Sequence, residues 1–151
     1  SFACDLKKWL QIMETYEKGA HAYHATMPTD SLARFADVMR ETEEYGFDKL
    51  KAAQAELGQK VRAALAERGI QSVAAPGFEA PGVVVSYTQD SSIHNGQKFA
   101  AEGMQIAAGV PLQCDEPADF KTFRIGLFGL DKLYDVDTAV NTFTQTLDRI
   151  L

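Results

Sequence analysis

Arg124 is the residue of this chain whose type and setting point most directly to chemistry. It lies in the stretch Phe123-Arg124-Ile125-Gly126-Leu127-Phe128-Gly129, where large apolar residues alternate with others. That alternation predicts a strand with one packed face and with Arg124 and Gly126 on the other face. A planar guanidinium holds a carboxylate in a two-point grip, and Gly126 leaves room for a ligand to approach it. The sequence therefore predicts a site for an acidic substrate or, alternatively, a strand arginine that pairs with a local carboxylate.

A second segment with anion-binding character, residues 19–30, leads into a predicted helix. It is rich in small and polar residues, and Pro28 suits the first turn of the helix, with Thr26 or Asp30 as its cap. Hydroxyl groups and free backbone N–H groups at a helix start favour bound anions. We expect Tyr23 and Thr26 to donate hydrogen bonds to a phosphate. The alternative is a capped helix with an aromatic side chain packed beneath it.

The metal-binding and redox residue types predict no further site. His21 and His24 are three residues apart but have no third ligand near them, so no metal site is expected. Cys4 and Cys114 are too few for a disulfide framework and lack metal-ligand spacing. This cysteine usage favours a reducing, cytoplasmic location.

Composition limits the class of protein. The 151 residues correspond to about one domain, and the hydrophobic fraction of 46% and charged fraction of 24% are ordinary for a globular protein. The net charge of −6 argues against nucleic acid as a partner, because phosphate backbones require clustered Lys and Arg. No apolar run has transmembrane length, and the start does not resemble a signal peptide. We therefore expect a globular protein without nucleic-acid or membrane partners.

The first half of the chain predicts long helices. Residues 2–13 carry apolar side chains at helical spacing with Asp5 as a cap, and this early packed segment suggests a piece of a longer protein. Residues 31–45 form an amphipathic helix. A further helix over residues 47–68 ends at a glycine, Gly69.

The second half predicts a small sheet and its helices. The expected strands are residues 70–74, 83–88 and 105–108 and the arginine strand, and the expected helices are residues 93–102 and one that begins after Asp135. The 83–88 stretch is β-branched and apolar enough to be a central strand. This order is typical of an α+β fold in which helices cover one face of a mostly antiparallel sheet of three or four strands. A predicted domain boundary after Tyr45 separates residues 1–45 from residues 46–151.

Together these motifs resemble a known enzyme family. Tyr23-His24-x-Thr26-x-Pro28, then long helices, then Phe123-Arg124-Ile125-Gly126 followed by Gly129, is similar to the C-terminal part of class V (fold type I) pyridoxal-phosphate aminotransferases. The alanine/serine–glyoxylate aminotransferases are the branch it resembles most, and the resemblance runs through essentially the whole chain. It implies that residues 1–45 end the large cofactor-binding domain and include a connecting helix. Residues 46–151 would then be the small C-terminal α+β (α/β) domain.

The resemblance also implies roles for the candidate residues. Arg124 matches the arginine that binds the α-carboxylate of amino-acid and 2-oxo-acid substrates such as glyoxylate. Tyr23 and Thr26 match the pair that contacts the phosphate of pyridoxal 5′-phosphate in the neighbouring subunit, which implies a homodimer. Both assignments agree with the chemistry of the residues, a guanidinium for a carboxylate and hydroxyls for a phosphate.

In this family the lysine that forms the Schiff base with the cofactor is expected upstream of the present stretch. The lysines of this chain lie on predicted solvated helix faces or in loops, and none has the neighbourhood of the family's cofactor lysine. Transamination requires that activated amine. We therefore expect a C-terminal fragment of a transaminase that contains no catalytic residue and is inactive by itself.

Two alternatives stay open at this point. One is a complete, non-catalytic α+β domain that binds a small molecule. The other is a sister enzyme on the same fold, such as cysteine desulfurase, phosphoserine aminotransferase or aminoethylphosphonate aminotransferase. Cys114, in the loop before Arg124, favours a desulfurase. The neighbouring Asp115 and Glu116 disfavour a thiolate, however, so we assign Cys114 a structural or incidental role.

Overall fold

The computed structural model describes residues 4–24 and 28–151. The chain divides into two compact units, Ser1–Glu41 and Thr42–Leu151, and each is described by itself. The predicted domain boundary after Tyr45 stays a prediction. Among the described residues, no helix combines the length and the apolar character that a membrane crossing requires.

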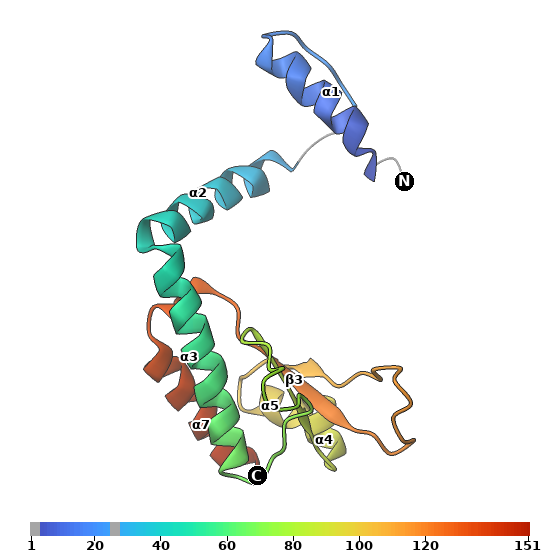
Figure 1. Ribbon diagram of the computed structural model, residues 1–151, viewed down its shortest axis with the longest axis vertical. Coiled ribbons are helices and arrows are strands. Elements are labelled where there is room, and N and C mark those ends of the chain that lie inside the picture. Colours follow the sequence, from blue (N-terminus) through green and yellow to red (C-terminus); the bar gives the residue numbers. More distant parts are fainter. Residues whose placement is uncertain (1–3, 25–27) are drawn as a thin grey trace. The chain divides into compact units, whose positions relative to one another are not determined.

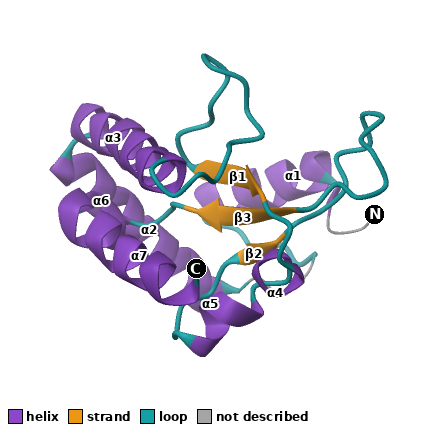
Figure 2. Ribbon diagram, turned by 90° about the horizontal axis from the view of Figure 1, so that it is seen from below, coloured by secondary structure: helices purple, strands orange, loops and turns teal. Residues whose placement is uncertain are grey.

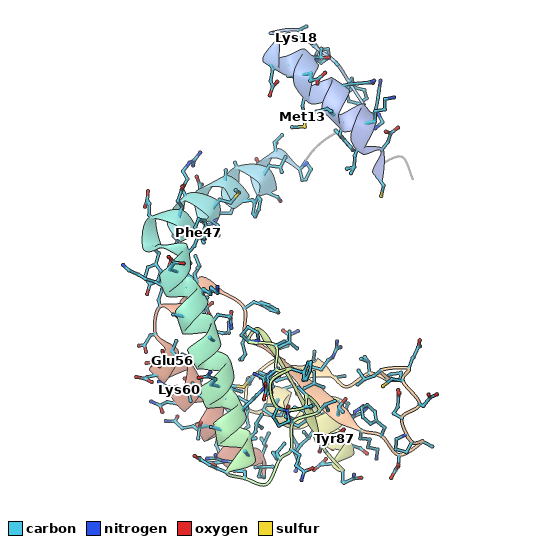
Figure 3. All side chains as sticks on the ribbon, in the orientation of Figure 1. Met13, Lys18, Phe47, Glu56, Lys60 and Tyr87 are labelled. Atoms are coloured by element: carbon cyan, nitrogen blue, oxygen red, sulfur yellow. The ribbon has the colours of Figure 1, made fainter. Side chains whose placement is uncertain are left out.

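Helix α1 (Leu6–Glu17) opens the first unit, with the cap that the sequence predicts. Asp5 accepts a hydrogen bond from the backbone N–H of Lys8 at 2.9 Å. Ile12 is the one buried residue of this helix. Trp9 is half-buried, and several large apolar side chains are exposed, among them Leu6, Leu10 and Met13, the last of which is labelled in Figure 3. Leu6, Leu10 and Met13, which suggested a packed segment, are therefore uncovered within the described residues.

Helix α2 (Thr29–Tyr45) begins directly after Pro28 and carries no buried residue. Gly46 separates it from helix α3 (Phe47–Ala66). The φ of Gly46 is +106°, a backbone conformation that glycine adopts without steric cost and other residues rarely adopt. The amphipathic helix therefore ends at Gly46 because glycine can adopt this backbone conformation.

Helix α3 packs one face into the core and ends as predicted. Gly69, with a φ of +74°, reverses the chain after the helix, and the N–H of Ile70 donates to the carbonyl of Leu65 at 3.0 Å. The buried residues of α3 are Leu50, Leu57, Gly58, Val61, Ala64 and Leu65. A side chain at Gly58 would collide with the carbonyl oxygen of Pro81. Gly58 therefore lets the chain segment around Pro81 lie directly against the helix.

The sheet has three antiparallel strands in the order β1-β3-β2. They are β1 (Val83–Tyr87), β2 (Ala107–Ala108) and β3 (Thr122–Gly126). The arginine strand β3 is therefore central, whereas the sequence suggested residues 83–88 for that position. The predicted strand over residues 70–74 is reduced to a single bridge, between Ser72 and Ser86.

Two short helices replace the single helix predicted over residues 93–102. Helix α4 (Ser91–His94) and helix α5 (Gln97–Ala101) are separated at Gly96, whose φ of +79° is left-handed. A left-handed residue cannot continue a right-handed helix, so the chain turns there. The sequence also missed the short helix α6 (Leu130–Leu133).

The C-terminal helix α7 (Val136–Ile150) has the predicted cap. Asp135 accepts a hydrogen bond from the backbone N–H of Thr138 at 2.9 Å. The helix lies beside α3 (Figure 1), and its buried residues include Phe143 and Leu147. Its apolar face therefore closes one side of the core.

Helices cover one face of the sheet (Figure 2), which confirms the predicted α+β arrangement. The core consists of Leu57, Val61, Leu65, Val84, Ile93, Phe99, Phe123, Ile125, Leu127, Phe143, Leu147 and Ile150. Phe99 is fully buried, and its ring centre lies 5.9 Å from that of Phe123 and 6.4 Å from that of Phe143. This aromatic group joins α5, β3 and α7.

Phe99→Ala should lower the free energy of unfolding by about 3–5 kcal/mol, because it leaves a cavity where α5, β3 and α7 meet. Phe78→Ala is the matched control. Since Phe78 is 84% exposed, its replacement should change stability by less than about 0.5 kcal/mol. Urea unfolding followed by circular dichroism compares the two variants. Similar losses in both would contradict the central place of Phe99 in the core.

Candidate functional site

The register of the sheet places Arg124 on the face of β3 that points away from the core. It is paired with Val85 of β1 on one side and with Ala107 of β2 on the other. On the inner face, Phe123 and Ile125 are 0% and 5% exposed, whereas Arg124 is half-buried. The alternation predicted from the sequence is confirmed.

The guanidinium of Arg124 is anchored at one atom and open at the others. Its Nε donates a hydrogen bond to the carbonyl oxygen of Ala108 at 2.9 Å. Among the residues that the structure describes, no carboxylate lies within ion-pair distance of it and its terminal amino groups donate no hydrogen bond. The alternative of a pair with a local carboxylate is therefore not found among these residues. The bond to Ala108 orients the guanidinium plane and leaves two amino groups for a planar anion.

The surroundings of Arg124 are apolar and partly open. Val85 is half-buried, and Tyr87 and Phe128 are 41% and 65% exposed. A Cβ at Gly126 would lie 3.7 Å from the ring of Phe128, an ordinary contact, so the described residues do not crowd this position. Apolar walls lower the local dielectric constant and strengthen any ion pair formed against them.

The loop that follows Ala108 is held together by Glu116. The carboxylate of Glu116 accepts hydrogen bonds from the backbone N–H groups of Leu112, Gln113 and Cys114 at 2.6, 2.9 and 2.8 Å. The bonds from Cys114 and Gln113 are the main cause that lowers the pKa of Glu116 from 4.5 to about 2. The loop beside Arg124 thus has a fixed shape at neutral pH.

Two residues of this loop adopt a backbone conformation that is uncommon for them. Gln113 and Asp115 have φ values of +59° and +63°. Positive φ is uncommon for residues other than glycine, although Asn, Asp and His adopt it more often than the rest. Surrounding contacts must therefore maintain this backbone conformation at Gln113 and Asp115. Between them, Cys114 is exposed and forms no disulfide. The sequence placed Cys114 in a loop before Arg124 but gave no signal that Glu116 holds this loop together.

The two predicted phosphate-binding residues belong to the first unit. The side chain of Tyr23 is 73% exposed. Thr26 lies outside the described residues. Arg124 belongs to the second unit. Their roles stay predictions.

The two histidines of the first unit make local contacts. Nδ1 of His21 lies 3.1 Å from the hydroxyl of Tyr16. The ring of His24 packs edge-on against Trp9 with the ring centres 4.9 Å apart. In residues 4–24 and 28–151, no group of three His, Cys, Asp or Glu side chains is placed to hold a metal ion.

Several lysines are tied to carboxylates. Lys60 pairs with Asp137 at 2.6 Å and with Glu56 at 2.5 Å, and Figure 3 shows Glu56 and Lys60 together on α3. Hydrogen bonds to Asp137 and then Glu56 raise the pKa of Lys60 to about 12. Lys98 and Lys132 pair with carboxylates at 2.8 and 3.2 Å. The raised pKa favours the ammonium form of Lys60, which is not a nucleophile.

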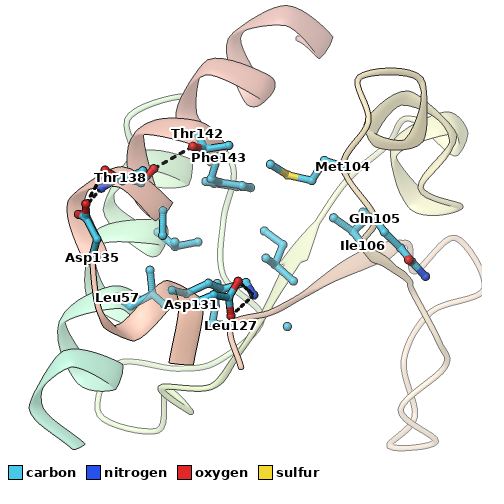
Figure 4. Close-up of a pocket in the computed structure, with 15 residues that line it drawn as sticks. Leu57, Met104, Gln105, Ile106, Leu127, Asp131, Asp135, Thr138, Thr142 and Phe143 are labelled. Atoms are coloured by element: carbon cyan, nitrogen blue, oxygen red, sulfur yellow. Dashed lines mark hydrogen bonds and ion pairs between the residues drawn. The ribbon is translucent and has the colours of Figure 1, made fainter. Parts of the chain in front are cut away.

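A separate pocket of about 330 Å³ opens between α3, α7 and the end of β3 (Figure 4). Its walls are mostly apolar and include Leu57, Val61, Met104, Ile106, Leu127 and Phe143. The carboxylate of Asp131 at its rim pairs with Lys132 at 3.2 Å, and that of Asp135 caps α7. Arg124 does not line this pocket. The pocket is therefore distinct from the site that the sequence predicts.

Similarity to known proteins is found at the level of structure. No family model matches the chain, and no curated protein matches it. The subgroup IV aspartate aminotransferase of Thermus thermophilus is 22% identical, with a TM-score of 0.60 over 95% of this chain and 39% of that chain. The alanine–glyoxylate aminotransferase of Nostoc sp. is 15% identical, with a TM-score of 0.69 over 91% of this chain and 36% of that chain.

The chain therefore spans less than half the length of these two enzymes, and it has the α+β fold of an aminotransferase C-terminal domain. The resemblance predicted from the motifs around Tyr23 and Arg124 is confirmed at the level of the fold. At 15–22% identity, the likeness identifies the fold and not the substrate.

Glu116→Ala should open the loop after Ala108 and remove its pH dependence. Because folding lowers the Glu116 pKa from 4.5 to about 2, the ionised carboxylate stabilises the loop fully above pH 4.5. That contribution is lost as the pH falls through about 2. Hydrogen-exchange protection of the amides of Leu112, Gln113 and Cys114 measures the effect.

In the parent chain these amides should be protected at about pH 5 and lose protection near pH 2, whereas in Glu116→Ala they should be unprotected at both values. Asp115→Asn is the control. It should retain protection, because the carboxylate of Asp115 accepts none of these bonds. Equal protection in the parent and Glu116→Ala would show that the carboxylate does not hold the loop.

Proposed function

We propose that this chain is the C-terminal part of a pyridoxal-phosphate-dependent aminotransferase of class V, most similar to the alanine/serine–glyoxylate branch. The observation that carries the proposal is the state of Arg124. In a fold shared with aminotransferases, its guanidinium stands on the outer sheet face with its amino groups not engaged by the described residues. The proposed enzyme is cytoplasmic and moves an amino group between an amino acid and a 2-oxo acid such as glyoxylate.

In this proposal Arg124 binds the α-carboxylate of both substrates. Ala108 holds Nε, so the side chain does not rotate freely and its two amino groups present a fixed edge. A carboxylate that accepts two parallel hydrogen bonds from that edge is held in position and in orientation. Val85, opposite Arg124 on β1, presents an apolar side chain on the same face of the sheet.

The residues present fit a supporting role toward the cofactor. Pyridoxal phosphate, when bound, supplies the electron sink that makes amino-group transfer possible. The exposed side chain of Tyr23 carries a hydroxyl that can donate to a phosphate oxygen, and the proposal pairs it with Thr26. Both would act on the cofactor of a neighbouring subunit, so the proposed enzyme is a homodimer. The exposed apolar residues of α2, Leu32, Phe35 and Met39, are consistent with pairing between subunits.

The isolated chain is proposed to be inactive. It spans 39% and 36% of the two similar aminotransferases, so most of the proposed enzyme lies outside it. Lys60, with a pKa raised to about 12, is a poor candidate for the amine that carries the cofactor. The Schiff-base lysine is therefore placed in the part that precedes this chain.

The alternatives differ from this proposal in measurable ways. A self-sufficient binding domain should unfold cooperatively by itself, whereas a fragment should associate or melt broadly. A desulfurase would require Cys114 as a nucleophile. The backbone N–H of Cys114 donates to the carboxylate of Glu116, and no basic residue that could act as its general base is adjacent to it in sequence.

Arg124→Lys in the full-length enzyme should lower kcat/KM by about ten- to a hundredfold, because a point charge cannot replace a charge-assisted two-point grip worth roughly 1.5–3 kcal/mol. Steady-state kinetics with an amino acid and glyoxylate measure the effect. Arg149→Lys is the control, since Arg149 pairs with Glu102 on another surface. Unchanged kinetics in Arg124→Lys would remove Arg124 from the substrate site.

The 151-residue chain mixed with pyridoxal phosphate and reduced with borohydride should show only scattered, substoichiometric lysine labelling by mass spectrometry. The reason is that the proposal assigns the cofactor lysine to another part of the enzyme, and the raised pKa of Lys60 favours its ammonium form. Lys60→Arg should leave the labelling pattern of the other lysines unchanged. Stoichiometric labelling of a single lysine would contradict the assignment of this chain as an inactive part of the enzyme.

A further inference from the structure

His94, the last residue of α4, bonds to both of the chain segments that meet at Arg124. Figure 2 shows α4 beside the β2 edge of the sheet. The imidazole Nδ1 of His94 lies 2.7 Å from the carbonyl oxygen of Thr122, the first residue of β3. The carbonyl oxygen of His94 accepts a hydrogen bond from the backbone N–H of Gly109, directly after β2, at 3.1 Å. His94 therefore ties β3 to the end of β2, although it belongs to neither strand.

The contact with Thr122 determines which nitrogen of the imidazole carries the proton. A carbonyl oxygen can only accept a hydrogen bond, so Nδ1 of His94 must be the donor. A histidine whose Nδ1–H bonds a main-chain carbonyl has a fixed tautomer and a fixed ring orientation. The half-buried side chain of His94 is therefore a rigid connection between α4 and β3.

The peptide group between Ala108 and Gly109 carries the two hydrogen bonds that link His94 to Arg124. Its N–H donates to the carbonyl oxygen of His94, and its C=O accepts the Nε–H of Arg124 at 2.9 Å. A peptide group is planar, so the direction of its N–H fixes the direction of its C=O. A bond at one end of the group also polarises it and strengthens the bond at the other end. The carbonyl of His94 thus helps to set where the carbonyl of Ala108 points.

These hydrogen bonds close a cycle that contains Arg124. The cycle runs from Arg124 back along β3 to Thr122, through the imidazole to His94, and through the Ala108–Gly109 peptide group to the guanidinium. Strand β2 is only two residues long, so its pairing with β3 covers little more than Arg124 itself. A short edge strand opens easily unless other contacts hold it. His94 supplies such contacts on both strands.

We propose that His94 is the positioning residue of Arg124. It does not touch the substrate. It holds the strand and the peptide group that fix the guanidinium plane, so that the two amino groups of Arg124 meet a carboxylate at a constant angle. The catalytic consequence rests on the proposed function of Arg124. Loss of the imidazole donor should leave the charge of Arg124 in place and loosen its orientation, on which a two-point grip depends.

Solvent exchange of the Arg124 Nε–H, followed by ¹⁵N NMR on the 151-residue chain, tests the cycle without an activity assay. His94→Phe retains an aromatic ring but no donor, and it should exchange this proton about three- to tenfold faster than the parent, as expected for one lost hydrogen bond. His94→Ala should do the same. His94→Asn provides an amide donor at the δ position and should restore slow exchange.

Asn95→Ala is the matched control on the same turn. The side chain of Asn95 accepts the backbone N–H of Gln97 at 3.0 Å, so its loss removes a local hydrogen bond of α5 and not one of the cycle. The Arg124 Nε–H should exchange in this variant as it does in the parent.

In the full-length enzyme, His94→Phe should lower kcat/KM about three- to tenfold for the amino acid and for the 2-oxo acid alike, because Arg124 is proposed to hold the carboxylate of both. His94→Asn should recover most of this loss. A role in packing alone would give the opposite order, since His94→Phe preserves the ring and His94→Asn removes it.

The proposal is overturned if the ¹⁵N spectrum of the parent places the His94 proton on Nε2 instead of Nδ1. It is equally overturned if His94→Phe and His94→Ala exchange the Arg124 Nε–H at the parent rate, or if His94→Asn recovers nothing. Faster exchange in the His94 variants, combined with unchanged kinetics in Arg124→Lys, would support the positioning of Arg124 by His94 and contradict only the substrate role of Arg124.

Discussion

The burial of the inner face of β3 is the constraint on which the rest of the structure depends. Phe123 and Ile125 are almost completely withdrawn from water against helices α3, α5 and α7. Because side chains alternate along a strand, this burial fixes Arg124 on the outer face. A shift of one residue in register would expose Phe123 and bury the guanidinium. The hydrophobic effect, and not attraction to a counter-ion, therefore orients the residue proposed to bind substrate.

The cations of the second unit differ in whether a carboxylate pairs with them. Lys60, Arg68 and Arg149 pair with carboxylates of other elements at the surface, where each pair adds little stability. Arg62 and Arg124 instead bond to backbone carbonyls. A carbonyl positions a guanidinium but leaves its charge available. Arg124, the residue proposed to bind substrate, is thus held without a counter-ion among the described residues.

Local patterns in the sequence predicted what depends on near neighbours along the chain. The alternation around Arg124, the Asp135 cap and the glycine stop after α3 all follow from interactions within a few residues. The hydrogen bonds that Glu116 accepts from the loop could not be predicted in this way. They require left-handed backbone at Gln113, which no local propensity favours. The hydrogen bonds of His94 join three segments whose approach depends on tertiary packing. The split of the 93–102 helix at Gly96 was readable in principle, since glycine is the residue that favours left-handed backbone.

Gly109 has a consequence for how this part of the molecule can vary. A side chain at that position would overlap the carbonyl of Thr122, so only glycine lets the chain leave β2 pressed against the central strand. Because the chain leaves β2 so close to β3, the carbonyl oxygen of Ala108 lies within hydrogen-bond distance of Nε of Arg124. Residues beyond Gly109 can then be inserted or deleted without moving the anchored arginine. The position of this arginine on its strand therefore does not depend on the length of the segment beyond Gly109.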